Sequence, residues 1–284
     1  MPTLHIIDDD DIVENNIIIE EKKPRKKSVV KVLEKFYMGA LPPHPCVSNT
    51  TEMTYTNGDN KGTKSTTYGG VPPIEIGVDE AGRGPMMGRV YTAAVILPKD
   101  DSFNHSLMKD SKKFHSEKKI REAADYIKKN ALAWCVTYSD EAEVDEFNIR
   151  NATHKSMHKS IKGIMKSDNY SSVSYTDYHL LIDGNDFKPF LVMDDDIGIV
   201  QVKHTCIEGG DNKYTAIAAA SILAKVSRDT YIEELCKEHP YLNTNYDLLK
   251  NKGYGTPKHM AGIREHGISP FHRKTFGLCR EATF

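Results

Sequence analysis

The sequence predicts an α/β domain with helices packed on a sheet, preceded by a long N-terminal segment of different character. From Ile74 onward, short runs rich in Val, Ile and Leu alternate with longer segments of helical periodicity. Residues 1–72 lack this alternation. With 284 residues, 39% of them hydrophobic, the chain is long enough for one large or two small domains and apolar enough to build a core.

The predicted elements follow one another in a regular order. Short runs of β-branched and aliphatic residues predict strands over 74–78, 90–97, 132–138, 179–183 and 198–204. Helical spacing predicts helices over 116–129, 148–166, 213–238 and 257–265. The second helix carries one apolar stripe, which includes Ile149, Met157 and Ile161. The third is rich in small residues between Ala216 and Ala224, so we expect it to lie close to the sheet.

Residues 1–72 form an extension that we expect to be mostly disordered. An acidic run, a basic run, a proline cluster and a stretch rich in Thr, Asn, Gly and Ser follow one another, and they offer little apolar surface to offset the entropy of ordering. Residues 28–37 are the exception, because their apolar residues have helical spacing. They fit either a short partner-binding helix or a transient amphipathic turn, and we favour the turn.

Cysteine use and hydropathy indicate a soluble intracellular protein. The five cysteines are odd in number and lack C-x-x-C spacing, which fits a reducing compartment. His204 and Cys206 share one face of a strand but have no second pair, so a zinc site is disfavoured. No apolar run reaches the roughly 20 residues that cross a bilayer. The basic run between Lys22 and Lys27 is either a nuclear import signal or, as we favour, a solvated charge run.

The most informative residues follow the first predicted strand. Asp79 and Glu80 end that strand, and the turn Gly82-Arg83-Gly84 comes one residue later. Carboxylate oxygens suit Mg²⁺, which shares its oxygen ligands with phosphate. Glycines let a backbone approach a ligand closely. Taken alone, the hexamer is equally typical of an ordinary turn, so the interpretation depends on partners elsewhere in the chain.

Asp183 and Asp211 are the candidate partners. Asp183 ends a second apolar run before a glycine, and Asp211 directly precedes the third helix. Each has an ordinary explanation, a turn for Asp183 and a helix cap for Asp211. One site explains all four acids more economically, because two-metal phosphodiester chemistry needs several carboxylates around two cations roughly 4 Å apart.

These residues resemble the motifs of type 2 ribonucleases H. The segment from Asp79 to Gly84 resembles the family's opening motif, and later blocks continue the match in order at 110–113, 143–149, 181–185, 218–229, 251–259 and 266–276. The last two blocks are similar to the single-chain bacterial form, ribonuclease HII. The resemblance covers about residues 74–277. Met86, Met87 and Arg89 depart from the usual pattern, and 167–178 are longer than usual.

The resemblance implies a fold and a division of the chain. The expected fold is ribonuclease H-like, with a mixed central sheet flanked by helices and a small C-terminal helical part. Residues 73–284 would form the catalytic domain, including a C-terminal helical segment that binds substrate. Residues 1–72 match nothing in the family.

The resemblance also implies an activity. Asp79, Glu80, Asp183 and Asp211 would hold two divalent ions, Mg²⁺ or Mn²⁺. The enzyme would cleave the RNA strand of RNA/DNA hybrids and nick DNA on the 5′ side of an embedded ribonucleotide, leaving a 3′-hydroxyl and a 5′-phosphate.

Further residues are assigned to substrate binding. By resemblance, the backbone of Gly82, Arg83 and Gly84 reads the 2′-hydroxyl, and the ring of Tyr254 packs on the sugar at the RNA-to-DNA junction. The candidate phosphate contacts are Ser111, Lys112, Lys113 and Lys225, and a solvated surface fits Lys112 and Lys113 equally well.

The expected partners are RNA/DNA hybrids and ribonucleotide-containing duplex DNA, with no membrane. We expect a monomer and take the N-terminal extension as a candidate docking segment for a protein. The alternatives are an inactive nucleic-acid-binding scaffold, or a carboxylate-site exonuclease or transposase-like enzyme on a related fold. An exonuclease or transposase-like enzyme of this kind would lack the Gly-Arg-Gly turn and the Gly-Tyr-Gly loop of this chain.

Overall fold

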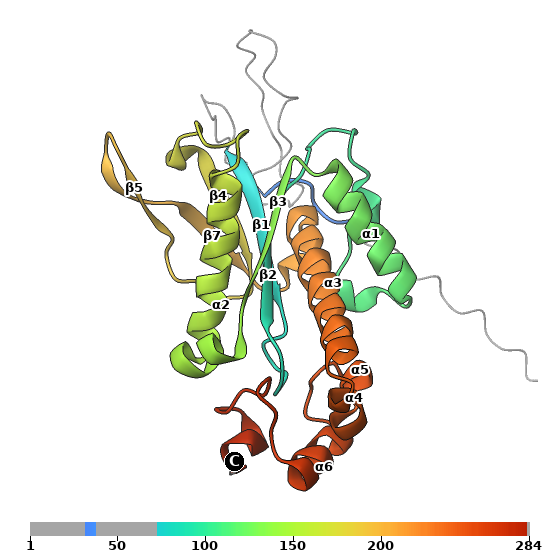
Figure 1. The fold of residues 1–284 in the computed structure, drawn as a ribbon. Helices are drawn as coiled ribbons and strands as arrows, with labels where there is room; N and C mark the ends of the chain where they lie inside the picture. The colour runs from blue at the N-terminus through green and yellow to red at the C-terminus, as the bar shows by residue number, and fades with distance from the viewer. Residues whose placement is uncertain (1–31, 38–72, 283–284) are drawn as a thin grey trace, which may run out of the picture. The chain divides into compact units, whose positions relative to one another are not determined.

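The computed structural model describes residues 32–37 and 73–282, which centre on a mixed five-stranded sheet (Figure 1). The strands lie in the order β3-β2-β1-β4-β7. β2 is antiparallel to β1 and β3, whereas β4 runs parallel to β1 and to β7. The bounds are β1 (Ile74–Ala81), β2 (Val90–Ile96), β3 (Ala133–Ser139), β4 (Tyr178–Asp183) and β7 (Lys203–Ile207). The prediction of an α/β fold with a mixed sheet is therefore confirmed.

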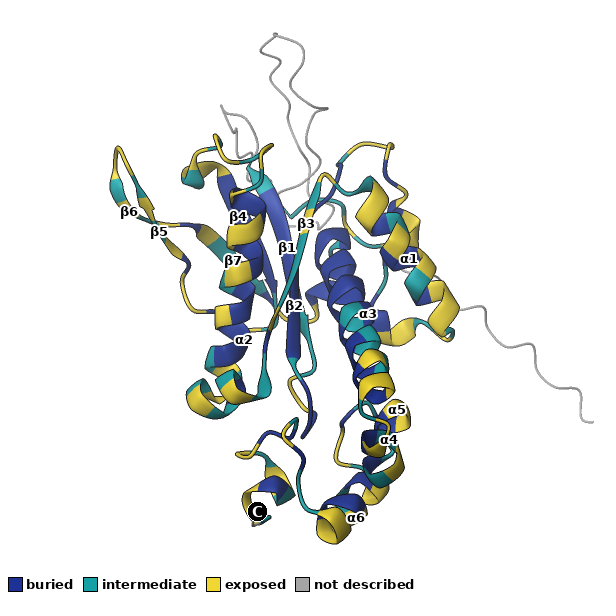
Figure 2. Ribbon diagram, in the orientation of Figure 1, coloured by how far each residue is buried: buried dark blue, intermediate teal, exposed yellow. Residues whose placement is uncertain are grey.

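Three long helices cover the two faces of this sheet. α2 (Glu141–Met165) packs on one face, and α1 (Glu117–Asn130) and α3 (Thr215–Glu238) pack on the other (Figure 1). The central strands are buried between these layers (Figure 2). α3 lies so close to β1 that a Cβ on Gly77 would be 2.2 Å from the carbonyl carbon of Ala216. The small residues of α3 therefore make close contact with the sheet, as predicted.

A small helical part follows α3. It contains α4 (Tyr241–Tyr246), α5 (Leu248–Asn251) and α6 (Pro257–His266), and a 3-10 helix at Gly277–Arg280. Their apolar side chains form one cluster with Met86 and Met87 of the loop between β1 and β2 and with the C-terminal half of α3. This cluster brings the end of the chain against the loop that follows Asp79 and Glu80.

Two predicted elements differ from the structure. Residues 198–204 are not one strand: β6 (Gly198–Gln201) pairs with β5 (Leu191–Asp194) in a separate hairpin, and β7 begins at Lys203. The Val202 amide donates to the carbonyl of Phe190 and so extends this hairpin by one pair before β7 begins. α2 begins at Glu141 rather than at 148, but Asn148 interrupts it with φ +64° and its side chain accepts from the amide of Asn151. Asn148 thus caps the part of α2 that follows it, and this part corresponds to the helix predicted over 148–166.

Residues 32–37 are not helical, so the short helix, the less favoured of the two alternatives for 28–37, does not form over these six residues. Glu34 forms an isolated parallel bridge with Tyr214, which directs its peptide groups to another segment instead of along a helix. The rest of the extension, including the basic run between Lys22 and Lys27, lies outside the described residues. Within the described ranges, no helix is both long and apolar enough to cross a bilayer.

Candidate active site

Asp79 and Asp183 lie side by side at the ends of two neighbouring parallel strands. In the register of β1 and β4, Val78 is opposite Ile182, so the next residue on each strand is one of the two acids. Ile76 and Val78 face α2, which leaves Asp79 on the face covered by α3. Asp79 is buried, whereas Glu80, one residue later, is partly exposed. The structure therefore brings together the two halves of the predicted cluster.

Asp211 is held next to Asp183 by the backbone. It lies in the 3-10 helix Gly210–Asn212 between β7 and α3. The Gly210 amide donates to Asp183 Oδ1 at 2.7 Å, and the Asp211 amide approaches the same atom at 3.4 Å. Asp211 does not cap α3, because the capping position is Tyr214 and has no side-chain hydrogen bond. The helix-cap explanation of Asp211 is thereby excluded.

Burial and mutual repulsion make this cluster costly to ionise. Burial, followed by the charges of Glu80 and Asp183, raises the pKa of Asp79 well above its usual value. Burial also raises the pKa of Glu80, against the opposing effect of Arg83. For Asp211, burial and then the charges of Asp183 and Asp110 raise the pKa. Such a site favours a bound cation, which neutralises the repulsion.

The donor atoms suit a hard divalent cation, although the side chains do not form a ready-made ligand set. The cluster offers only carboxylate oxygens, the ligands that Mg²⁺ prefers. Within residues 32–37 and 73–282, no three His, Cys, Asp or Glu side chains are grouped so that they could hold a metal ion. Glu80 instead faces Arg83, with Oε1 and Nη1 3.5 Å apart. The fit thus rests on charge, burial and donor chemistry, and not on a ligand set assembled within the described residues.

Two polar groups behind the acids were missed by the sequence reasoning. The Ser221 hydroxyl on α3 hydrogen-bonds Asp79 and lies 3.0 Å from the Ser111 hydroxyl. The side-chain nitrogen Nδ2 of Asn212 donates both to Asp211 Oδ1 at 2.9 Å and to Asp110 Oδ2 at 3.1 Å. Ser111 is buried in this arrangement, so its side chain supports Asp79 from behind instead of facing solvent.

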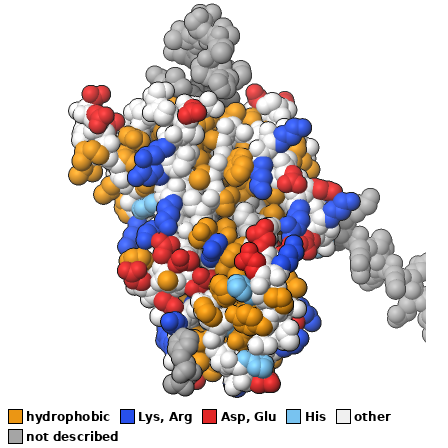
Figure 3. Space-filling model, in the orientation of Figure 1, with side chains coloured by type: hydrophobic (Ala, Val, Ile, Leu, Met, Phe, Trp, Pro, Cys, Tyr) orange, Lys and Arg blue, Asp and Glu red, His pale blue; other side chains and the backbone are white. Residues whose placement is uncertain are grey.

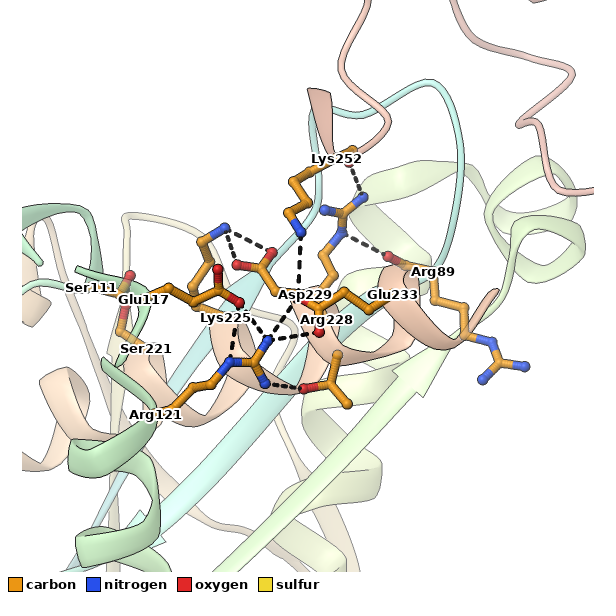
Figure 4. A network of polar contacts seen from close by, with 11 residues as sticks. Arg89, Ser111, Glu117, Arg121, Ser221, Lys225, Arg228, Asp229, Glu233 and Lys252 are labelled. Atoms are coloured by element: carbon orange, nitrogen blue, oxygen red, sulfur yellow. Dashed lines mark hydrogen bonds and ion pairs between the residues drawn. The ribbon is translucent and has the colours of Figure 1, made fainter. Parts of the chain in front are cut away.

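The three predicted lysine contacts lie in different surroundings. Burial would lower the pKa of Lys112, but the charges of Asp211 and Asp110 raise it, so this ammonium group lies near the carboxylates. Lys113 donates to the side chain of Asn212. Lys225 forms an ion pair with Asp229 one turn along α3 (Figure 4). Only Lys112 therefore interacts electrostatically with the acids from a position beside them.

The Gly82-Arg83-Gly84 turn is built on a buried arginine. Arg273 is fully buried and donates to four backbone carbonyls, those of Gly82, Arg83, Pro85 and Gly88, at 2.7 to 3.0 Å. Burial, followed by the charge of Arg228, lowers the pKa of Arg273 to about 10. Gly82 has φ +96°, and a Cβ there would lie 2.2 Å from Arg228 Nε. The turn is therefore preorganised, and no larger residue fits at its first position.

Tyr254 lies against this turn. A Cβ on Gly84 would be 3.3 Å from Tyr254 Cε1, and the side chain of Tyr254 is half exposed. The loop that carries the tyrosine is fixed by backbone contacts: Met86 donates to the Gly253 carbonyl at 2.8 Å, and Arg228 Nη2 donates to the Lys252 carbonyl at 2.8 Å (Figure 4). The structure thus places an exposed aromatic ring beside the glycines that were predicted to read a sugar.

Two buried histidines link Tyr254 to the C-terminal part. The Ser269 amide donates to His272 Nδ1 at 2.8 Å, so the proton of His272 is on Nε2. That Nε2 lies 3.1 Å from His259 Nε2, and His259 Nδ1 lies 2.9 Å from the Tyr254 carbonyl. Both rings are therefore neutral and each has one defined tautomer. Burial, followed by the neighbouring His259, lowers the pKa of His272 to about 3.

Arg228, Arg273, His259 and His272 had no role in the sequence reasoning. They stand in the blocks at 218–229, 251–259 and 266–276, so their positions in the pattern were noted. A charged or titratable residue type does not by itself reveal that it is buried. Only the contacts identify these four as supports of the turn and of the tyrosine loop.

Comparisons with known proteins identify relatives that cover most of the chain. A family model described as ribonuclease HII matches residues 76–279. A protein named ribonuclease HII from Bacteroides thetaiotaomicron is 45% identical over 205 residues, which cover 72% of this chain and 90% of the relative.

Solved structures support the fold. A ribonuclease HII of Archaeoglobus fulgidus, determined in complex with PCNA, superposes with a TM-score of 0.52 at 22% identity and covers 72% of this chain and 96% of that one. Bst-RNase HIII in complex with Mn²⁺ also has a TM-score of 0.52, at 18% identity, covering 73% and 68% of the two chains. The predicted ribonuclease H-like fold is confirmed.

Proposed function

Because the chain belongs to the ribonuclease HII family, and is therefore an endoribonuclease that depends on divalent metal, we propose that Asp79, Glu80, Asp183 and Asp211 hold its metal ions. The proposed reaction is hydrolysis of the RNA strand of RNA/DNA hybrids, and nicking of DNA 5′ of an embedded ribonucleotide. The observation that carries the assignment is the adjacency of Asp79 and Asp183, with the turn of Asp211 hydrogen-bonded to Asp183.

Two divalent ions bound there would supply an activated water and neutralise the charge on the leaving 3′ oxygen. The residues of the chain contribute the remaining parts of the site. Ser221 and the Glu80 amide hydrogen-bond Asp79 and keep its carboxylate in place. Lys112 adds a positive charge beside the carboxylates, where a substrate phosphate would be attracted. The products are a 3′-hydroxyl and a 5′-phosphate.

Substrate choice is assigned to the Gly82-Arg83-Gly84 turn and Tyr254. A 2′-hydroxyl both donates and accepts, and it is the group that distinguishes ribose from deoxyribose. Support for its recognition by the turn comes from the absence of side chains on Gly82 and Gly84 and from the ring of Tyr254 beside Gly84. The carbonyls of Gly82 and Arg83 already accept from Arg273, so the turn meets a sugar with its position fixed.

The proposal also covers the metal ions, the oligomeric state and the partners of the chain. Mg²⁺ and Mn²⁺ both fit an all-carboxylate site, and the related ribonuclease HIII was solved with Mn²⁺. We assign the chain a monomeric state, with residues 73–284 as the catalytic domain and residues 1–72 as an extension that can receive a protein partner.

Replacement of Asp79 by Asn tests the proposed function. The amide keeps the size of the side chain and removes one charged ligand, so turnover of an RNA/DNA hybrid should fall by roughly 100-fold or more. The matched control is Asp125→Asn, which changes an exposed acid on α1 and should leave turnover unchanged. Near-normal turnover of the Asp79 variant with saturating Mg²⁺ would exclude this residue from the site.

The same assay separates the alternatives when the hybrid carries labels at both ends. Internal fragments that appear first indicate an endonuclease. Loss of one terminal label before any internal cut would indicate an exonuclease. Binding of the hybrid without cleavage would indicate an inactive scaffold.

A further inference from the structure

Residues 33–37 pack against the turn that carries Asp211, although they lie outside residues 76–279 that match the family model. We call residues 33–37 the N-terminal strap. They belong to the same compact unit as the sheet and the helices that cover it.

The strap bonds to the residues that join Asp211 to α3. The Glu34 amide donates to the Lys213 carbonyl at 2.7 Å, and the Thr215 amide donates to the Glu34 carbonyl at 3.0 Å. α3 has no side-chain cap at Tyr214, so one of its free N-terminal amides is satisfied by the strap. The strap therefore fixes the backbone directly after Asp211.

An ion pair with a buried carboxylate anchors the strap to β1. Glu75 is 2% exposed, and its carboxylate accepts from the Tyr37 amide at 2.9 Å and from Lys99 Nζ at 2.5 Å. Lys99 Nζ also donates to the Lys35 carbonyl at 2.7 Å. A buried charge pair is costly unless its remaining hydrogen-bonding capacity is used. Two backbone groups of the strap meet that requirement here.

Apolar and aromatic contacts complete the attachment. The Tyr37 ring lies edge-on to His179 of β4, with ring centroids 5.2 Å apart, and 5.6 Å from the ring of Tyr214. Leu33 packs against the cluster formed by α1, α3 and the sheet. The strap is thus joined both to β4, which carries Asp183, and to the start of α3.

We propose that the strap positions Asp211 for metal binding. Asp183 fixes the turn at Gly210, and the strap fixes it again at Lys213 and Thr215, so the carboxylate of Asp211 is held between two attachment points. Freeing the second point lets the turn move and lowers metal affinity without removing any ligand. This inference rests on the proposed role of Asp211 as a metal ligand.

The test uses two substitutions of Glu34 in the full chain. Glu34→Pro removes the amide that donates to Lys213, whereas Glu34→Ala keeps the amide and changes only an exposed side chain. For the proline variant, the Mg²⁺ concentration for half-maximal activity should rise roughly three- to tenfold, the effect of about one lost hydrogen bond, with kcat restored at saturating Mg²⁺. The alanine variant should match the unsubstituted chain.

Two further readouts do not depend on turnover. Mn²⁺ binding measured by calorimetry, without substrate, should weaken by a similar factor in Glu34→Pro. Amide hydrogen exchange of residues 212–216 in the metal-free protein should be faster. Unchanged metal affinity and exchange would overturn the proposal. If Glu34→Pro does not fold, Tyr37→Ala replaces it, with the same expected shift and the same overturning result.

Asp211→Asn distinguishes a failure of this inference from a failure of the proposed function. If Asp211→Asn retains full activity, Asp211 is not a ligand and both fail. If Asp211→Asn is inactive while Glu34→Pro binds metal normally, only the role of the strap is overturned.

Discussion

At the scale of single residues, three of the proposed metal-binding acids, Asp79, Glu80 and Asp211, lie where ionisation is costly, because burial raises the pKa of each. Asp79 is buried beside Glu80 and Asp183, and burial and repulsion favour its protonated form. With Asp79 as the proposed metal ligand, protein stability and metal affinity are opposed at this position. The same charges that suit a divalent ion destabilise the protein when no ion neutralises them.

This opposition gives a prediction for Asp79→Asn in metal-free buffer. The pKa of Asp79 is higher in the folded than in the unfolded protein, so the unfolded state ionises first as pH rises, and stability is lost above the unfolded value of roughly 4. The Asn variant has no ionisable group at this position, so its stability does not fall in this way as pH rises. Its melting temperature in chelator should exceed that of the unsubstituted chain at pH 7, and the difference should shrink toward pH 4. A lower melting temperature at pH 7 would contradict this account of the cluster.

At the scale of elements, the contact between α3 and β1 sets the geometry of the site. The small residues of α3 lie directly over Gly77, and Ser221 of the same helix reaches Asp79. A shift of this helix would move Ser221 away from Asp79 and would also displace the turn of Asp211.

Gly77→Ala tests this contact. The added Cβ would lie 2.2 Å from backbone atoms of Ala216, which cannot rotate away, so we expect a loss of about 1–3 kcal/mol in the free energy of unfolding and lower activity. Gly255→Ala is the matched control, because its Cβ would meet only the flexible end of Met86 at 2.8 Å. Denaturant unfolding measures both. Equal stabilities of the two variants would show that the close approach is dispensable.

The sequence predicted most of these elements, and the exceptions have physical reasons. Strand, acid and glycine follow one another locally at Asp79 and at Asp183, so the pattern singled out two acids that the structure places at neighbouring strand ends. Residues 198–204 were predicted as one strand because strand propensity does not report which sheet a segment joins. The spacing of apolar residues over 28–37 allowed a helix or a turn and could not show the bridge to Tyr214, because that pairing depends on residues far along the chain.

At the scale of the whole molecule, charge is balanced. The net charge is −2, and basic and acidic side chains are interspersed on the face seen in Figure 3. The proposed binding of a nucleic acid duplex would therefore depend on local groups such as Lys112, since the net charge provides no overall basic excess. Composition does not show where the charges lie on the surface. It also does not show that Arg228 and Arg273 are buried.

The measurement that tests the central claim most directly uses a DNA duplex with one embedded ribonucleotide, incubated with the enzyme and Mg²⁺. The account predicts a single nick on the 5′ side of the ribonucleotide, leaving a 3′-hydroxyl. Tyr254→Phe should retain this nick, whereas Tyr254→Ala should lose it selectively and still cleave a long RNA/DNA hybrid. Cleavage at another position, digestion from an end, or equal activity of Tyr254→Ala on both substrates would contradict the account.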